Sequence, residues 1–364
     1  MPALPWMLVE SKRDAGATYG TRFESVGMAL PERRLSTHEL MASTRHHTRI
    51  DLERLTGIRE RRVCGPGETS LSLEIAAARD CLARSRYTGA DLDMVIEASI
   101  TRYVDETTHR LEPPLSLSVK EAIGAHAATS FDISNACAGM LTGVFVLNDL
   151  IRRGAIRRGM VVSGERITGL GANAARSIRS ILSPQLASLT LGDAGAAVIV
   201  DRAASPAGIL IAGFTTLAEH SRLCLGMPAL HHPGAVMFTR ARKIHDVAME
   251  SGPPLLEDVL GAAGLSLGDI DWLIPHQTSV RAIKAGERVL AERSGEHPRH
   301  VAITVDELGN TASTTLFVAL HKLLDQHALH GRDKVLLLSV ASGLQVGVVV
   351  FEVDELEVTH GELH

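Results

Sequence analysis

Cys137 stands alone between a short β-branched run and a long helical pattern. Residues 129–133 predict a strand, small residues surround the cysteine, and apolar residues recur at helical spacing over 141–153. This order places the sulfur at a helix N-terminus, where unpaired backbone N–H groups and the helix dipole favour a thiolate. Such a cysteine is a candidate nucleophile that can carry an acyl group as a thioester. The alternative, which composition by itself favours, is a buried and inert cysteine.

Two polar residues later in the chain lie where regular structure is expected to end. The apolar run 272–275 ends at His276, and a Gly-Asn turn places Asn310 before a helical run over 315–324. A neutral imidazole and an amide N–H can together hold a carbonyl oxygen as it becomes an enolate. Taken singly, the histidine is typical of a protein surface and the asparagine of a turn or helix cap. Together with Cys137 they favour acyl-thioester chemistry.

Composition is compatible with a large aliphatic core. The 364 residues are 45% hydrophobic and only 3% aromatic, which suits one or two domains. The net charge of -5 gives no electrostatic reason to expect a nucleic acid or an anionic membrane as partner. The four cysteines lie far apart without a Cys-x-x-Cys pair, so neither zinc nor disulfides are suggested. Residues 1–16 lack a continuous apolar run, and no run reaches transmembrane length, which predicts a soluble cytoplasmic protein.

An internal repeat predicts the architecture. The segment GADLDMVI at 89–96 resembles GDIDWLI at 268–274. A second matching pair, the strand-like runs 160–163 and 335–340, has nearly the same offset, about 175 residues. Helical patterns alternate with buried-type strands in both parts, which predicts parallel β-α-β layering. The chain is therefore expected to be an α/β protein made from one duplicated unit.

Six segments carry a resemblance to a known family. They are TGIRERR at 56–62, NACAG at 135–139, LGDAGAA at 191–197, IPHQ at 274–277, GNT at 309–311 and ASGL at 341–344. With these segments in this order, the chain resembles the thiolase superfamily and, within it, the 3-oxoacyl-(acyl-carrier-protein) synthase III-like condensing enzymes. The resemblance covers about residues 23–353. It implies a thiolase fold in which two duplicated halves, 1–204 with the nucleophilic cysteine and 205–364 with the histidine and asparagine, stack as α-β-α-β-α layers.

The same resemblance implies a role for each site residue. Cys137 would accept the acyl group, while His276 and Asn310 would bind the thioester carbonyl of the second substrate. The backbone N–H groups of Cys137 and Gly343 would form the oxyanion hole. The implied reaction is a Claisen condensation that gives a 3-oxoacyl product in fatty acid, polyketide or other secondary-metabolite biosynthesis. The implied substrates are acyl-CoA or acyl-carrier-protein thioesters, with no cofactor and no metal, and the implied assembly is a homodimer.

Glu112 bears on how the carbanion for such a condensation would form. It lies 25 residues before Cys137 and is followed by proline, which resembles the OleA-type enzymes that join two fatty acyl thioesters head to head. In those enzymes the matching glutamate removes an α-proton, and a carboxylate desolvated by an acyl channel would have a raised pKa suited to a base. Ordinary synthase III enzymes have no acid here, because decarboxylation generates the carbanion. The other interpretation is a glutamate in a surface loop.

Two basic clusters are candidates for binding phosphate groups of CoA or of a carrier-protein arm. The first contains Arg59, Arg61 and Arg62, and the matching segment of the family borders the pantetheine tunnel. The second contains Arg240, Arg242 and Lys243. For both clusters the alternative is a solvated charged face.

Three functions are compatible with these residues. The first is a condensing enzyme. The second is a synthase III-like acyltransferase that passes the acyl group to an oxygen or nitrogen nucleophile, and Asn310 argues against it because acyl transfer needs no enolate-stabilising amide. The third is a non-catalytic subunit of a heterodimeric synthase, which the combination of Cys137, His276 and Asn310 disfavours. Acyl chain length, the choice between CoA and carrier protein, and the source of the carbanion stay open.

Overall fold

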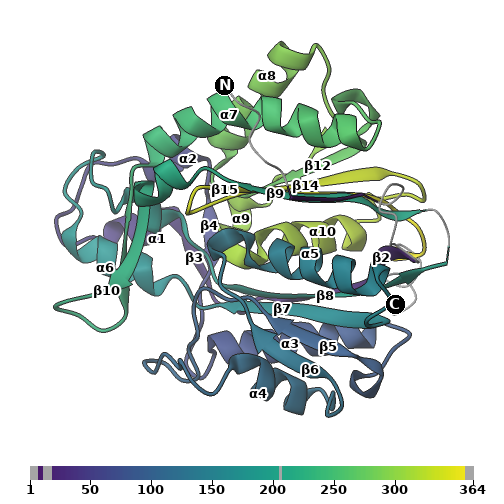
Figure 1. Ribbon diagram of the computed structural model, residues 1–364. Coiled ribbons are helices and arrows are strands. Elements are labelled where there is room, and N and C mark those ends of the chain that lie inside the picture. The colour runs from purple at the N-terminus through teal and green to yellow at the C-terminus, as the bar shows by residue number, and fades with distance from the viewer. Residues whose placement is uncertain (1–6, 11–18, 205–206, 357–364) are drawn as a thin grey trace.

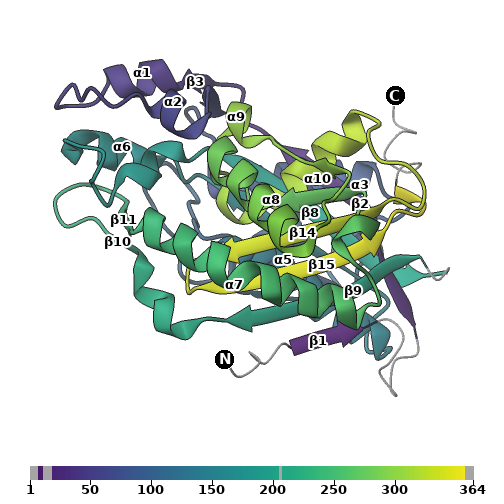
Figure 2. The same ribbon diagram turned by 90° about the horizontal axis from the view of Figure 1, so that it is seen from above.

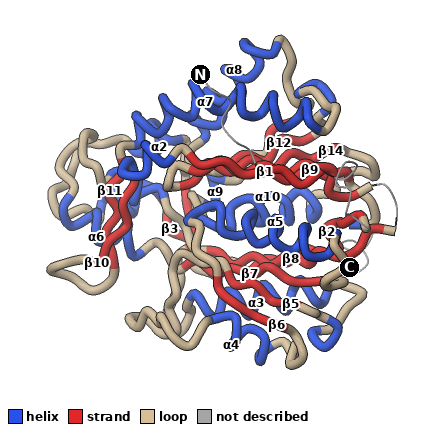
Figure 3. Tube along the Cα trace, in the orientation of Figure 1, coloured by secondary structure: helices blue, strands red, loops and turns tan. Residues whose placement is uncertain are grey.

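The computed structural model describes residues 7–10, 19–204 and 207–356, and this part of the chain folds into alternating layers of helix and sheet. Two large β-sheets lie one over the other with helices between and outside them (Figures 1 and 3). The middle layer is α5 (Gly139–Arg152) and α10 (Thr315–Asp325). The outer layers are α3 (Ser70–Ala83) with α4 (Leu115–Ala122), and α7 (Ala241–Ala262) with α8 (Val280–Ser294). The expected α-β-α-β-α order is confirmed.

Within the described residues, one sheet has six strands and the other has five. The larger has the order β1 (Met7–Glu10), β9 (Gly208–Thr216), β15 (Gln345–Glu352), β14 (Lys334–Ala341), β12 (Trp272–Pro275) and β13 (His300–Val301). The smaller has the order β2 (Gly20–Ala29), β8 (Ala194–Ala203), β7 (Arg158–Glu165), β5 (Met94–Glu97) and β6 (Thr129–Asp132). The strand order β9-β15-β14-β12-β13 therefore matches β2-β8-β7-β5-β6, which is the internal repeat seen in three dimensions. The division of the chain at residues 204 and 205 stays a prediction.

The expected parallel layering is right for only part of each sheet. The pairs β5–β6, β5–β7, β12–β13 and β12–β14 are parallel. The pairs β7–β8, β2–β8, β14–β15, β9–β15 and β1–β9 are antiparallel. For β14 and β15 the reason is plain, because residues 342–344 form too short a connection for a parallel crossover.

The main core lies between the two sheets, around the middle helices. Leu316, Phe317 and Val318 of α10 are almost fully buried there. The ring of Phe23 on β2 meets Phe317 edge-on at 5.9 Å between centroids and Phe351 on β15 at 4.8 Å. These contacts join strands of both sheets to each other and to α10, so this helix is held in a fixed position between them.

Shorter elements gather at one end of the layers, to the left in Figure 1 and also in Figure 2. They are β3 (Arg34–Ser36), β4 (Glu60–Arg62), β10 (Cys224–Pro228), β11 (Ala235–Thr239), α1 (Thr37–Ala42), α2 (Leu52–Thr56), α6 (Gly169–Ser177) and α9 (Val305–Leu308). At this end β6, β7, β12 and β14 finish, so the loops that follow them meet there. None of the helices described is both long and apolar enough to cross a bilayer.

Candidate active site

Cys137 lies in a single turn of 3₁₀ helix, η2 (Ala136–Ala138), between β6 and α5. Ala136 has a left-handed φ of 47°, a conformation that costs free energy for a residue with a side chain. Gly139 begins α5 in tight contact with the end of β5, since an added Cβ there would lie 2.5 Å from the carbonyl oxygen of Ala98. The strand, the strained turn and the close helix start therefore fix the half-buried Cys137 in one place.

Asn310 is held by backbone bonds to a segment from the other half of the chain. Its N–H donates to the carbonyl oxygen of Thr190 (2.9 Å), and its own carbonyl oxygen accepts from the N–H of Gly192 (3.0 Å). The Oδ1 atom of Asn310 accepts from the N–H of Ala312 (2.9 Å). Because that bond occupies the amide oxygen, the amide NH₂ is the group that can donate to a ligand.

His276 follows β12 and is anchored to the neighbouring strand. Its backbone N–H donates to the carbonyl oxygen of Leu338 on β14 (2.8 Å). The side chain is only 8% exposed, and its Nδ1 has no hydrogen-bond partner among the residues that the structure describes. Burial lowers the pKa of His276 to about 4, so the imidazole is neutral at neutral pH.

The next residue, Gln277, connects the histidine with the asparagine. Its amide NH₂ donates to the carbonyl oxygens of Pro275 (2.8 Å) and Ala302 (3.0 Å). Its amide oxygen accepts from the N–H groups of Thr304 (2.9 Å) and Val305 (3.2 Å). Thr304 and Val305 lead through α9 to Asn310. The sequence offered Gln277 only as part of a motif, and its positioning role is visible only in the folded chain.

The three residues that the sequence predicted for the site, Cys137, His276 and Asn310, line one cavity of about 1010 Å³. Contacts between elements explain why they meet: η2 packs against β14 and against the 3₁₀ turn η6 (Ala312–Thr314) that follows Asn310. Ala341, Ser342 and Leu344 also line the cavity. Gly343 lies between them with a φ of 132°, which only glycine adopts readily. The structure thus brings Cys137, His276 and Asn310 together beside the Gly343 turn.

The thiol of Cys137 is not the thiolate that its place before a helix predicts. Burial raises its pKa to about 12, and the nearby negative charge of Glu165 adds to the effect. The loss of solvation therefore outweighs the helix N-terminus. The resting cysteine is a neutral thiol, so a reaction at its sulfur needs a proton acceptor. The neutral imidazole of His276 in the same cavity can take that proton.

Glu165 was not singled out from the sequence, although it joins the two walls of the site. It is fully buried at the end of β7. One carboxylate oxygen accepts from the N–H of Ile100 (2.8 Å) and from the hydroxyl of Ser313, and the other accepts from the N–H of Thr101 (3.0 Å). Ile100 lines the cavity, and Ser313 lies in η6. A glutamate ending a strand carries no sequence signal for such a role.

Cys224 is a second cysteine in this cavity that the sequence did not indicate. It lies on β10 opposite Thr239 of β11, with Gly226 opposite Met237. All four residues line the cavity, because alternate residues of a hairpin share one face. The other two cysteines, Cys64 and Cys81, are buried away from it, and burial raises the pKa of each thiol.

Glu112 is not brought to this cavity. It is exposed in the loop before α4 and is not among the lining residues. The expectation of a carboxylate desolvated by an acyl channel is therefore not met within this chain. Nothing in the described residues covers the Glu112 side chain, which is the physical reason for the difference.

The two basic clusters lie in different surroundings. Arg59 is 63% exposed at its side chain and pairs with Asp306 (2.8 Å). Arg62 donates to the carbonyl oxygens of Pro31 (3.0 Å) and Glu32 (3.2 Å). Neither arginine lines the cavity. The second cluster does, with Arg240, Arg242 and Lys243 at the start of α7.

Comparisons with known proteins agree with this geometry. Residues 131–217 match the family described as 3-oxoacyl-[acyl-carrier-protein] synthase III, and residues 260–353 match its C-terminal part. A β-ketoacyl-[acyl-carrier-protein] synthase III of Roseiflexus castenholzii is 32% identical over 330 residues, which cover 87% of this chain and 93% of that protein. A synthase III of Streptomyces lividans is 31% identical, over 89% of this chain and 92% of its own.

Solved structures show the same fold. The priming β-ketosynthase from the R1128 polyketide biosynthetic pathway superposes with a TM-score of 0.80 at 25% identity, over 94% of this chain and 98% of its own. A variant of Xanthomonas campestris OleA also gives a TM-score of 0.80, at 20% identity over 94% and 99% of the two chains. At that lower identity the likeness to OleA shows the fold alone.

Proposed function

This chain belongs to the 3-oxoacyl-[acyl-carrier-protein] synthase III family, and on that premise we propose that it joins two acyl thioesters through an acyl-enzyme on Cys137. The observation that carries the proposal is the meeting of Cys137, His276 and Asn310 on one cavity. The reaction class is Claisen condensation of acyl thioesters in lipid or polyketide biosynthesis, which is the class of its relatives.

The first half-reaction is acyl transfer to Cys137. The sulfur attacks the carbonyl carbon of the first thioester while His276 takes the thiol proton. The backbone N–H groups of Cys137 and Gly343 hold the oxyanion. The C–S bond to the carrier then breaks, and the carrier thiolate leaves with the proton from His276. This step is supported by the resting state of the two groups, because burial leaves the thiol protonated and leaves the imidazole in the same cavity unprotonated.

The second half-reaction forms the carbon–carbon bond. Asn310 and the neutral His276 donate hydrogen bonds to the thioester carbonyl oxygen of the second substrate, where negative charge develops as the enolate forms. The enolate carbon attacks the acyl carbonyl on Cys137 and the C–S bond to the cysteine breaks, which releases a 3-oxoacyl thioester. The cysteine thiolate then takes a proton from water. The bond from Ala312 to Asn310 supports this role, because it turns the amide NH₂ into the available donor.

Decarboxylation of a malonyl-type thioester is the proposed source of the enolate. Glu112 is exposed and outside the cavity, so within one chain it is not placed to remove an α-proton there. The expected result is that Glu112→Gln keeps full condensation activity with a malonyl thioester. Loss of that activity, or condensation of two non-malonyl thioesters by the wild type alone, would assign the proton-abstracting role to Glu112 instead.

The finer features of the proposal concern donors, assembly and location. Acyl-CoA or acyl-carrier protein would deliver the acyl groups, with the phosphate of the carrier near the cavity-lining Arg240, Arg242 and Lys243. A homodimer in the cytoplasm is the proposed working form. The end position of β6 in its sheet supports it, because an edge strand can pair with a second copy.

The experiment incubates the enzyme with an acyl-CoA, with or without a malonyl thioester, and follows free CoA, carbon dioxide and acyl products by mass spectrometry. The proposal predicts carbon dioxide and a 3-oxoacyl product only when both substrates are present. Acyl esters or amides formed without carbon dioxide would instead identify an acyltransferase that uses an oxygen or nitrogen nucleophile.

A further inference from the structure

The side chain of Asn310 is oriented by the short turn that follows it. Its Oδ1 atom accepts from the N–H of Ala312, which lies in η6 (2.9 Å). The backbone of Asn310 is bonded to Thr190 and Gly192 of the first half instead. The position of the main chain therefore depends on residues 190–192, while the direction of the amide depends on where η6 lies.

Ser313, the middle residue of η6, ties this turn to the first half of the chain. Its side chain is buried, its hydroxyl donates to one carboxylate oxygen of Glu165, and that hydroxyl lies 2.6 Å from the hydroxyl of Ser163. Both partners belong to β7, and η6 as a whole packs against β7 and η2. The amide of Asn310 is thus connected to β7 through Ala312 and Ser313.

Glu165 is the fixed end of this connection. In addition to the hydroxyl of Ser313, its carboxyl group accepts from the N–H of Ile100 (2.8 Å), the N–H of Thr101 (3.0 Å) and the hydroxyl of Thr101 (2.7 Å). Four donors on two oxygens suit an ionised carboxylate, which only accepts hydrogen bonds and forms stronger ones than a neutral group. A carboxylate with four partners changes position little, so Glu165 is a firm anchor for η6.

We propose that Ser313 is a positioning residue for condensation, and that its hydrogen bond to Glu165 holds η6 where the amide of Asn310 faces the carbonyl oxygen of the second substrate. This inference rests on the proposed function, and it adds how the first half of the chain controls a binding group of the second. Without the hydroxyl, η6 keeps its packing against β7 but loses the bond that fixes it there. The amide then also adopts directions in which it does not donate to the enolate oxygen, and condensation slows because this donor has to be in place as charge develops.

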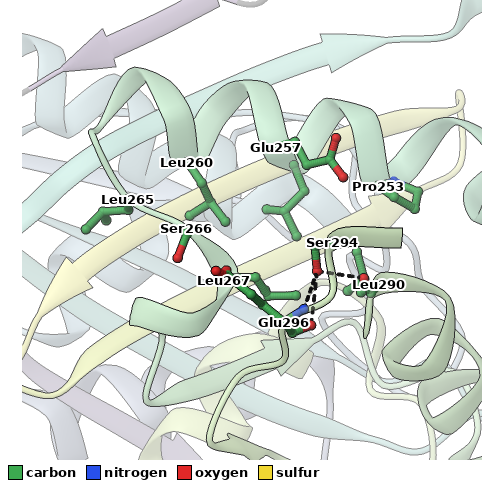
Figure 4. Close-up of a pocket in the computed structure, with 10 residues that line it drawn as sticks. Pro253, Glu257, Leu260, Leu265, Ser266, Leu267, Leu290, Ser294 and Glu296 are labelled. Carbon is green, nitrogen blue, oxygen red and sulfur yellow. Dashed lines mark hydrogen bonds between the residues drawn. The ribbon is translucent and has the colours of Figure 1, made fainter. Parts of the chain in front are cut away.

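Ser294 on α8 offers a matched control for the loss of a serine hydroxyl. It lies beside a hollow of about 330 Å³ that residues of α7 and α8 line (Figure 4). Its hydroxyl lies 2.8 Å from the carbonyl oxygen of Leu290 and 3.0 Å from that of Glu296. All three residues belong to the second half, so removal of this hydroxyl leaves the connection between η6 and β7 intact.

The test compares Ser313→Ala, Ser313→Cys, Ser163→Ala and Ser294→Ala in two rates: acylation of Cys137, read by intact mass, and formation of the 3-oxoacyl product with a malonyl thioester. We expect Ser313→Ala to lower kcat and kcat/KM for the malonyl thioester equally, on the order of tenfold, because the amide acts as the enolate forms. Acylation should stay at the wild-type rate. Ser313→Cys keeps a weak donor and should lie between wild type and Ser313→Ala. Ser163→Ala and Ser294→Ala should condense at the wild-type rate, since each leaves the bond from Ser313 to Glu165 in place.

A double variant separates positioning from a general loss of structure. Once Asn310→Ala has removed the amide, Ser313→Ala should slow condensation no further, because it acts through that amide. Effects that multiply in the double variant would overturn the proposal. A loss of condensation in Ser163→Ala as large as that in Ser313→Ala would overturn it as well.

The same measurements keep this inference apart from the proposed function. A wild-type condensation rate in Ser313→Ala would overturn the positioning role and leave the proposed function standing. A wild-type protein that forms no adduct on Cys137 and no 3-oxoacyl product would refute the proposed function, and the role of Ser313 with it.

Discussion

The two middle helices both follow a 3₁₀ turn that contains an alanine in the left-handed region, but the residues after these two alanines lie in different surroundings. α5 follows η2, where Ala136 has a φ of 47°, and α10 follows η6, where Ala312 has a φ of 56°. Cys137 comes directly after the first alanine and Ser313 directly after the second. The strained turn is therefore present in both copies of the repeat, and its backbone conformation costs on the order of 1–3 kcal/mol in each. In both copies the next residue carries a side chain that could act as a nucleophile, a thiol in one and a hydroxyl in the other.

The surroundings of the two turns differ. Cys137 is half-buried and lines the cavity. Ser313 is 2% exposed, and its hydroxyl donates to Glu165 and lies 2.6 Å from the hydroxyl of Ser163. One copy of the turn opens toward substrate, and the other ties the second half of the chain to the first. The backbone thus supplies the position, and the neighbouring side chains decide whether that position does chemistry.

The residues at the ends of the matching strands also differ between the two sheets. In the smaller sheet β5 ends at Glu97 and β7 at Glu165, both fully buried. In the larger sheet the matching strands β12 and β14 end at Pro275 and Ala341, followed by His276 and the Gly343 turn. Buried carboxyl groups support the first half, and the polar groups that can bind a carbonyl come mainly from the second.

The largest effect is expected at Asn310. Asn310→Asp keeps the acceptor for the N–H of Ala312 but loses the amide donor, and Asn310→Ala loses both. Each should lower the condensation rate about 10²–10³-fold, as loss of one oxyanion donor typically does. Acylation of Cys137 should continue at the wild-type rate. Equal loss of both half-reactions, measured by rapid quench and intact mass, would break the assignment of carbonyl binding to the second half.

A pH dependence is expected from the buried carboxyl groups of the first half. Burial raises the pKa of Glu97 to about 8 and also raises that of Glu74, and the two groups repel each other as anions. Because Glu97 holds its proton more tightly when folded, its contribution to stability is complete below the unfolded value near 4.5 and is lost as the pH rises toward 8. The contribution of Glu97 to the free energy of unfolding should therefore fall by more than about 1 kcal/mol between about pH 5 and pH 8.

Glu97→Gln is the matched variant, because its side chain is neutral at every pH. Denaturant titrations at several pH values should show that the stability of wild type relative to Glu97→Gln falls as the pH rises from about 5 to 8. If the free energy of unfolding changed with pH in the same way in both proteins, Glu97 would not be held protonated in the folded state. The two sheets would then not differ in the protonation of buried carboxyl groups at their strand ends.

The smallest effect is expected at Ser313. Ser313→Ala removes one donor to the buried carboxylate of Glu165, which should cost about 1–2 kcal/mol of stability and leave acylation of Cys137 unchanged. Ser313→Cys, made together with Cys137→Ala, places a thiol in the matching turn. No acyl adduct should form there, because that position faces the interior. An adduct on the introduced cysteine would contradict the contrast between the two turns.

The sequence predicted those features of the fold and the site that are determined by residues close together in the chain. The strand, small residues and helix around Cys137, the strand end at His276 and the turn at Asn310 are visible in a few consecutive residues. The internal repeat predicted a duplicated α/β unit, and the family resemblance implied its layered arrangement. The antiparallel pairs, the carboxylate of Glu165 under the site and the presence of Cys224 in the cavity depend on contacts between distant segments. The raised pKa of Cys137 is of the same kind, since burial by other elements overrides the effect of its own helix.

The central claim is that Cys137 carries the acyl group although Cys224 lines the same cavity. Intact-mass measurement after treatment with decanoyl-CoA, followed by peptide mapping, tests it directly. The account predicts one acyl adduct, located on Cys137, which is absent in Cys137→Ala and unchanged in Cys224→Ser. An adduct that persists in Cys137→Ala, on Cys224 or elsewhere, would contradict it.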